Sequence, residues 1–322
     1  MATGDQLKAL IRSHFSDDPE RFYTSALQVA AHEAGRGHGA LAHDIREMVD
    51  KARSVRGAAV LRFPPEMLGL VIAEEPSLPI SALVVQPGQM RRIERIISEH
   101  DQQNKLKQHG LSHRRKILLV GPPGTGKTMT AKVLAHEVHL PLYTIQVDRL
   151  TTRFMGETAA KLRQLFDLIL QQPGVYLFDE FDAIGGERSF ENDVGEMRRV
   201  LNAFLQFIEQ DTSDSLIIAA TNSPELLDRA LFRRFDDVLY YVHPDEHERR
   251  RLMENVLGAF RPSRLAWQRL LRESDGLSHG EIDWACRDAI KRAVLEDRER
   301  VTSADVASTL RDRSTAYASR FA

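Results

Sequence analysis

Cysteine is almost absent from this chain of 322 residues, in which Cys286 is the only example. A single cysteine excludes an internal disulfide framework and fits a reducing compartment. Because Ile282, Ala285 and Ala289 share a helical face with Cys286, we expect an ordinary core side chain there.

Aromatic residues are also few, and tryptophan occurs only twice, at Trp267 and Trp284. Both tryptophans lie at helical spacing with leucines in the C-terminal part of the chain. We therefore expect both to belong to the core of a C-terminal helical domain.

Long apolar runs are missing as well. The longest uncharged apolar run, Met67 to Ala73, is far too short to span a membrane. Near the N-terminus, Asp5, Lys8 and Arg12 interrupt any stretch that could serve as a signal peptide. The sequence therefore predicts a cytoplasmic protein without a membrane partner.

Neither sign of charge is in excess. The chain carries 44 basic and 46 acidic residues, for a formal net charge of −2. An overall field of this size attracts neither nucleic acid nor an anionic membrane. We therefore do not expect nucleic acid as a partner.

The first 82 residues are expected to form two segments. Residues 1–54 hold three apolar runs at helical spacing, separated by Asp17-Asp18-Pro19 and by three glycines between positions 35 and 39. They predict a small N-terminal helical domain that recognises a substrate or a partner. Residues 55–82 hold four prolines and little periodicity, which favours a linker.

Short apolar runs alternate with helical patterns from Lys116 onward, as in α/β domains. Five runs are nearly continuous in apolar residues, which is typical of strands buried on both faces: Ile117–Val120, Leu142–Val147, Val175–Phe178, Leu216–Ala220 and Val238–Val242. Residues 83–243 are thus predicted to form a large nucleotide-binding α/β domain with a doubly wound, parallel five-stranded sheet. Residues 244–322 show only helical patterns and predict a C-terminal helical lid domain.

The strongest motif is Gly121-Pro122-Pro123-Gly124-Thr125-Gly126-Lys127-Thr128, a full match to the phosphate-loop pattern G-x-x-x-x-G-K-[ST]. A predicted strand precedes it, and a helical pattern follows from Met129. Glycines let backbone N–H groups curl around a phosphate, and the helix adds its positive dipole end. Lys127 would contact the β- and γ-phosphates, and the Thr128 hydroxyl would bind Mg²⁺. Residues 121–129 therefore predict an ATPase that uses ATP and Mg²⁺.

Polar side chains follow two of the predicted strands, at the edge where α/β sheets bind ligands. Asp179 would hold the Mg²⁺ shell, and Glu180 would activate the attacking water as a general base. Asn222 either contacts the γ-phosphate or the water, or caps a helix that begins at Pro224.

Together with the segment from Leu227 to Asp236, these motifs resemble the P-loop NTPases of the classical AAA+ ATPase family. That family includes the membrane-anchored AAA proteases and the microtubule severers katanin and spastin. The resemblance covers roughly Leu83 to Leu310. It implies a nucleotide-binding domain with a helical lid, assembled as a hexameric homo-oligomer whose sites are shared between subunits.

The same resemblance implies that Arg233 and Arg234 are arginine fingers, which reach the γ-phosphate of a neighbouring subunit. The family separates its two arginines by two residues, whereas here they are adjacent, so the identity of the finger stays open. The alternative is a solvated basic pair beside Asp236 and Asp237.

Two further segments differ from the family. The lid reads Ser278-His279-Gly280-Glu281 where the family has Ser-Gly-Ala-Asp, and Gly280 would still bring its backbone against the adenine. The four residues also fit a capping box. Gln210-Asp211-Thr212 stands where Asp-Gly-Phe is frequent, so we expect signalling between subunits to differ.

In the family, an aromatic-hydrophobic-glycine tripeptide after the second strand lines the pore and grips polypeptide. Phe154-Met155-Gly156 fits this pattern, and residues 185–194 would form a second pore loop. The alternative is that Phe154 and Met155 are buried against the following helix. Two functions therefore remain open. The first is protein unfolding by threading, where any protease would be a separate chain; the second is an assembly switch or loader that acts without threading.

Overall fold

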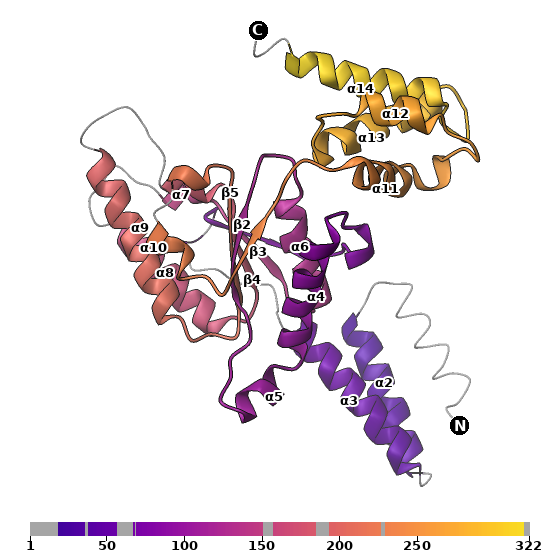
Figure 1. The fold of residues 1–322 in the computed structure, drawn as a ribbon. Helices are drawn as coiled ribbons and strands as arrows, with labels where there is room; N and C mark the ends of the chain where they lie inside the picture. The colour runs from indigo at the N-terminus through magenta and orange to yellow at the C-terminus, as the bar shows by residue number, and fades with distance from the viewer. Residues whose placement is uncertain are drawn as a thin grey trace. The chain divides into compact units, whose positions relative to one another are not determined.

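The computed structural model describes residues 19–35, 38–56, 67, 69–150, 157–184, 193–226 and 229–318. The chain divides into two compact units, Met1–Phe63 and Pro64–Ala322, and Figure 1 labels most of their helices and strands. In the first unit, α2 (Pro19–Gly35) packs against α3 (Gly39–Arg56) around Ala26 and Val49. The first helical run that we expected lies outside the described residues. None of the helices in the described part of the chain is long and apolar enough to cross a membrane.

The second unit is built on a six-stranded sheet with the strand order β1-β3-β4-β5-β2-β6. The strands are β1 (Val71–Glu74), β2 (Lys116–Val120), β3 (Leu142–Ile145), β4 (Val175–Phe178), β5 (Leu216–Thr221) and β6 (Asp237–Tyr240). β2 to β6 are parallel, whereas β1 pairs antiparallel with β3. The five parallel strands are those predicted from apolar runs, with small shifts at their ends.

The sixth strand, β1, lies within the segment that we expected to be a linker. That prediction is wrong for residues 71–82, because β1 is an edge strand in which Val71 is buried and the next three residues are exposed. An edge strand of this kind lacks the continuous apolar run by which the central strands were recognised. Hydrogen bonds also fasten the segment to α6 (Lys127–Glu137), since Glu74 accepts from Lys132 and Glu137 accepts from the Ile80 N–H.

Helices cover both faces of the sheet (Figure 1). On one face, α4 (Pro87–Asp101) and α6 share a core with alternate strand residues such as Ile117 and Leu119. On the other face, Phe178 of β4 contacts Phe166 of α8 (Glu157–Gln171) and Phe204 of α9 (Asp193–Gln210). The shorter elements are η2 (Ile80–Ala82), α5 (Gln103–Gln108), α7 (Val147–Leu150), η3 (Phe181–Ile184), η4 (Pro224–Leu226) and α10 (Arg229–Phe232).

The lid has a core of its own. The helices of the lid are α11 (Glu246–Leu257), η5 (Gly258–Phe260), α12 (Trp267–Glu273), α13 (His279–Leu295) and α14 (Ser303–Ala318). Cys286 is fully buried in this core, as predicted. Val84 also belongs to the lid core, although its neighbours Leu83 and Val85 lie in the core of the α/β domain.

The two tryptophans are placed differently from our expectation. Trp284 is 58% exposed, so its assignment to the lid core is wrong. The buried face of α13 includes Ile282, Cys286 and Ala289, and Trp284 lies off this face, with its ring 5.0 Å from the Arg313 guanidinium carbon. Trp267 is only partly buried against the lid core.

Candidate nucleotide site

The phosphate loop connects β2 to α6 and depends on its glycines for its shape. Gly121 and Gly124 have φ angles of 153° and 73°. A Cβ at Gly121 would come within 2.3 Å of the Tyr241 carbonyl oxygen, and one at Gly124 within 2.7 Å of the Ser278 hydroxyl oxygen. Both positions therefore require glycine, for backbone conformation and for space.

Lys127 lies at the start of α6, with its ammonium group inside the loop. Its Nζ donates hydrogen bonds to the carbonyl oxygens of Gly121 (2.6 Å) and Pro122 (2.8 Å) and to Asn222 Oδ1 (2.7 Å). Burial lowers the pKa of Lys127, although Asp179 and Asp182 act in the opposite direction. A desolvated cation that donates only to neutral oxygens is suited to receive an anion.

Thr128 and Asp179 meet at the end of β4, and these are the two predicted ligands of Mg²⁺. Thr128 Oγ1 donates to Asp179 Oδ2 at 2.7 Å, and Asp179 Oδ1 accepts from the Glu180 backbone N–H at 3.0 Å. A hydroxyl and a carboxylate are hard oxygen ligands of the kind that Mg²⁺ prefers. The residues present therefore fit this ion.

Glu180, the predicted base, follows Asp179 in the turn after β4. Its φ of 52° is unusual for a residue other than glycine and costs roughly 1–2 kcal/mol. Its carboxylate is exposed and makes no hydrogen bond to the described residues. The geometry thus leaves this acid available to a water molecule at the same sheet edge as Asp179.

Asn222 follows β5 and lies between two parts of the site. Its side-chain oxygen accepts from Lys127, and its backbone N–H donates to Asp182 Oδ1 at 3.2 Å. The side chain is therefore positioned at the phosphate loop, as the first of our two interpretations requires. Pro224 begins η4, a single 3-10 turn.

The lid contacts the phosphate loop through backbone atoms. Gly280, near the start of α13, donates its N–H to the Gly124 carbonyl oxygen at 2.8 Å. Ser278 and Glu281 form the predicted capping box at the start of the same helix. The resemblance to the family brought the Gly280 backbone to the nucleotide, but nothing in the sequence indicated a hydrogen bond to Gly124, because the two positions lie in different domains.

His279 occupies the position where the family has glycine, and both nitrogens of its imidazole are buried. Neither ring nitrogen has a hydrogen-bond partner among the described residues. Burial and, to a smaller extent, the neighbouring His243 lower the pKa of His279 to about 4, although Asp245 acts in the opposite direction. The ring is therefore neutral at physiological pH.

Arg233 and Arg234 follow α10 and are both exposed. Arg234 forms an ion pair with Glu209 of α9, whereas Arg233 has no ion pair among the described residues. Asp236 Oδ2 accepts from the backbone N–H groups of Arg115 and Lys116, both at 2.9 Å. Asp237 binds Arg92 and Arg114 instead of the adjacent pair. The basic pair is therefore not neutralised by the two acids that follow it.

The residues Phe154, Met155 and Gly156 lie outside the described residues, as do positions 185–192 of the second expected pore loop. Hydrogen bonds connect the described elements on the two sides of residues 151–156. Lys161 of α8 donates to the Arg149 carbonyl oxygen of α7 at 3.1 Å, and Arg149 donates to the Gly69 carbonyl oxygen at 2.9 Å.

Comparison with known proteins agrees with this geometry. The model of the AAA family, described as the ATPase family associated with various cellular activities, matches residues 117–242. An uncharacterized AAA family ATPase of Sinorhizobium fredii is 33% identical over 324 residues, which cover 98% of this chain and 96% of that protein. The similarity therefore extends over both units.

Other relatives match over shorter stretches. The proteasome-activating nucleotidase of Methanothermobacter thermautotrophicus is 30% identical over 75% of this chain and 61% of its own length. Vacuolar protein sorting-associated protein 4B of Mus musculus is 35% identical over 56% of this chain and 42% of its own. The crystal structure of the FIGL-1 AAA domain aligns with a TM-score of 0.61 at 24% identity, over 80% of this chain and 95% of that one. At this identity the structural match supports the fold alone.

Proposed function

Because this chain belongs to the AAA family of ATPases and hydrolyses ATP, we propose that it forms a hexameric ring that unfolds proteins by threading polypeptide through its pore. The observation that carries this proposal is the position of Phe154-Met155-Gly156. This tripeptide stands between α7 and α8, two elements that a hydrogen bond from Lys161 to Arg149 holds together. An aromatic residue placed in the sequence between two elements that contact each other is suited to transmit movement of the domain to a bound chain.

Each residue of the site has a separate part in the proposed hydrolysis. Lys127 exchanges its neutral oxygen partners for phosphate oxygens, and the N–H groups of the loop hold the β-phosphate. Glu180 accepts a proton from the attacking water, and Asn222 orients the γ-phosphate or that water. Mg²⁺, held by Thr128 and Asp179, would neutralise charge on the phosphates.

Arginine from a neighbouring subunit completes the proposed site. Arg233 is the better candidate for the finger, because Arg234 is occupied by Glu209 within its own subunit. An arginine finger is typically worth ~10³–10⁵ in rate. This arrangement would make hydrolysis depend on assembly.

The relatives bear on what the ring acts on. Similarity to a proteasome-activating nucleotidase favours a protein substrate. If a protease acts together with the ring, the same similarity favours a protease on a separate chain. The alternative function is a nucleotide-dependent assembly switch or loader that acts on another complex without threading. The two differ in whether Phe154 must touch polypeptide.

The test replaces Phe154 with alanine. If Phe154 grips polypeptide, Phe154→Ala should keep basal ATPase activity within a few-fold of the parent and lose stimulation by an unfolded model protein. Trp284→Ala is the matched control, because Trp284 is an exposed aromatic residue of the lid. This control should retain the stimulation.

Thermal unfolding of the same variants separates the alternatives. If Phe154 is buried, its truncation should cost about 3–5 kcal/mol of stability and lower the melting temperature. That result would favour the assembly switch. A stable Phe154→Ala protein that polypeptide still stimulates would rule out the gripping role.

A further inference from the structure

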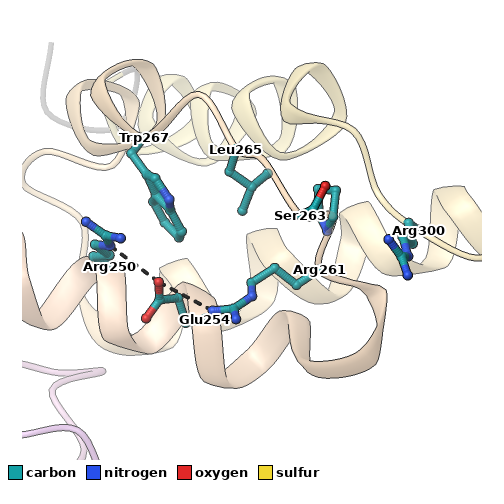
Figure 2. Close-up of a pocket in the computed structure, with 8 residues that line it drawn as sticks. Arg250, Glu254, Arg261, Ser263, Leu265, Trp267 and Arg300 are labelled. Carbon is teal, nitrogen blue, oxygen red and sulfur yellow. Dashed lines mark hydrogen bonds and ion pairs between the residues drawn. The ribbon is translucent and has the colours of Figure 1, made fainter.

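A cavity of about 440 Å³ opens within the lid, and Figure 2 shows the side chains around it. The lining consists of Arg250, Glu254, Arg261, Pro262, Ser263, Leu265, Trp267 and Arg300. These residues come from α11, from the start of α12 and from the connections that follow η5 and precede α14. None of them belongs to the nucleotide site described above.

The cavity has an excess of positive charge. Glu254 is the one acid that lines it, and its Oε1 lies 3.3 Å from Arg250 Nε and 3.4 Å from Arg261 Nη1. One carboxylate oxygen cannot satisfy two guanidinium groups, each of which carries five N–H donors. Arg300 has no ion pair among the described residues. The lining therefore keeps an excess of two positive charges and many unused donors.

An apolar wall stands beside these cations. The Arg250 guanidinium carbon lies 4.8 Å from the centroid of the Trp267 ring, which fixes the cation against the aromatic face. Trp267 and Leu265 are partly buried against the lid core, so their positions are also fixed. Figure 2 shows Leu265 and Trp267 on the side of the cavity opposite Glu254 and Arg261.

Guanidinium groups beside an apolar wall favour a ligand that has both carboxylates and an apolar group. Guanidinium groups bind carboxylates through paired hydrogen bonds, and an aromatic ring beside them favours an apolar neighbour of the acid. An inorganic anion would bind to the guanidinium groups but would leave the side chains of Trp267 and Leu265 exposed to water. The volume suits a few side chains and is too small for a folded domain.

We propose that this cavity is a docking site for a short acidic segment of a partner protein, in which carboxylates stand next to an apolar side chain. Arg261 and Arg300 receive the carboxylates, and the apolar side chain lies against Trp267 and Leu265. This function is separate from polypeptide threading and does not depend on it. The lid thus carries a recognition site in addition to its contact with the phosphate loop.

The test measures binding of a fluorescein-labelled peptide, Gly-Ser-Glu-Glu-Leu-Gly, to the full chain by fluorescence anisotropy. Arg300→Glu should weaken binding by about tenfold or more, because it removes charge-assisted hydrogen bonds and adds a repelling charge. Arg251→Glu changes the net charge equally at an exposed position of α11 that does not line the cavity. This control should bind within about threefold of the parent. Basal ATPase activity should be unchanged in both variants.

A second peptide, with serine in place of leucine, examines the apolar wall and should bind several-fold more weakly. Equal losses for Arg300→Glu and Arg251→Glu would mean that binding follows the overall charge of the lid, and would overturn the proposal. Equal binding of the two peptides, with both displaced by millimolar inorganic phosphate, would identify a simple anion site and overturn it as well.

Discussion

Lys127 donates its three ammonium hydrogens to three neutral oxygens, two of them in its own loop. An arriving phosphate therefore meets a cation that is already held in place and partly desolvated. Such preorganisation reduces the entropy lost when the nucleotide binds. The hydrogen bond from Lys127 to Asn222 also brings Asn222, which is 95 residues away in the sequence, into the same site.

Glu180 is the residue whose replacement separates binding from hydrolysis. Glu180→Gln keeps the size of the side chain and removes the base, so ATP should bind normally while turnover falls by ~10² or more. Glu225→Gln is the matched control, because Glu225 is an exposed acid in the turn just after Asn222. The control should hydrolyse ATP at the parent rate. Near-parental turnover of Glu180→Gln would show that another group is the base.

At the scale of elements, α13 meets the phosphate loop through one backbone hydrogen bond, from Gly280 to Gly124. The first-turn N–H groups of a helix have no partner within it, so Gly280 has this donor to offer. The contact joins the lid directly to the loop that would surround the phosphates. It is thus a route by which nucleotide could set the position of the lid.

Replacing Gly280 by proline tests this contact. Proline is tolerated in the first turn of a helix, but it lacks the N–H and places its ring against the Gly124 carbonyl. We expect Gly280→Pro to weaken binding of a fluorescent ATP analogue by roughly tenfold. Gly280→Ala keeps the donor, and its Cβ would lie 3.5 Å from Gly124, an ordinary contact distance. If alanine weakened binding as much as proline, the hydrogen bond would not be the cause.

The five parallel strands were predictable, and the antiparallel edge strand β1 was not. Strands β2 to β5 are buried along most of their length, and this burial leaves a continuous apolar run in the sequence. β1 leaves no such run, since most of its residues face solvent. Trp284 was misplaced for a different reason. It was assigned to the core from its spacing with leucines, although it lies off the face of α13 that Ile282 and Cys286 mark as buried.

At the scale of the whole molecule, the proposed ring makes each active site depend on two chains. The double variant Arg233→Ala/Arg234→Ala and the variant Glu180→Gln should each be nearly inactive alone. When they are mixed, some interfaces join an intact Glu180 to an intact arginine pair, so ATPase activity should partly recover. The measurement is the ATPase rate across mixing ratios, after subunits have exchanged.

Two results would contradict the shared site. Well-exchanged mixtures could show no recovery, or a protein that stays monomeric in solution could hydrolyse ATP at the full rate. The single variants add a finer test. Because Arg234 forms an ion pair with Glu209 of its own subunit, Arg233→Ala should lose more activity than Arg234→Ala.

The nucleotide-binding residues could be predicted because a phosphate loop and strand-end acids are local patterns with a known chemistry. The contacts between distant parts could not. Asp211, in the segment where the family often has Asp-Gly-Phe, is buried and binds the Arg115 side chain. Neither this ion pair nor the bond between Gly280 and Gly124 has a sequence signal, because each depends on how separate elements fold against one another.

The side chain of Val84 lies in the lid core, whereas those of the residues before and after it in the sequence lie in the core of the α/β domain. The side chains of an extended segment alternate in direction, so three consecutive residues can connect two bodies that otherwise pack separately. Movement of the lid must then pull on residues 83–85, which the chain reaches directly after η2. By thermodynamic reciprocity, a partner that restrains this segment changes the affinity for nucleotide by the same factor that nucleotide changes the affinity for the partner.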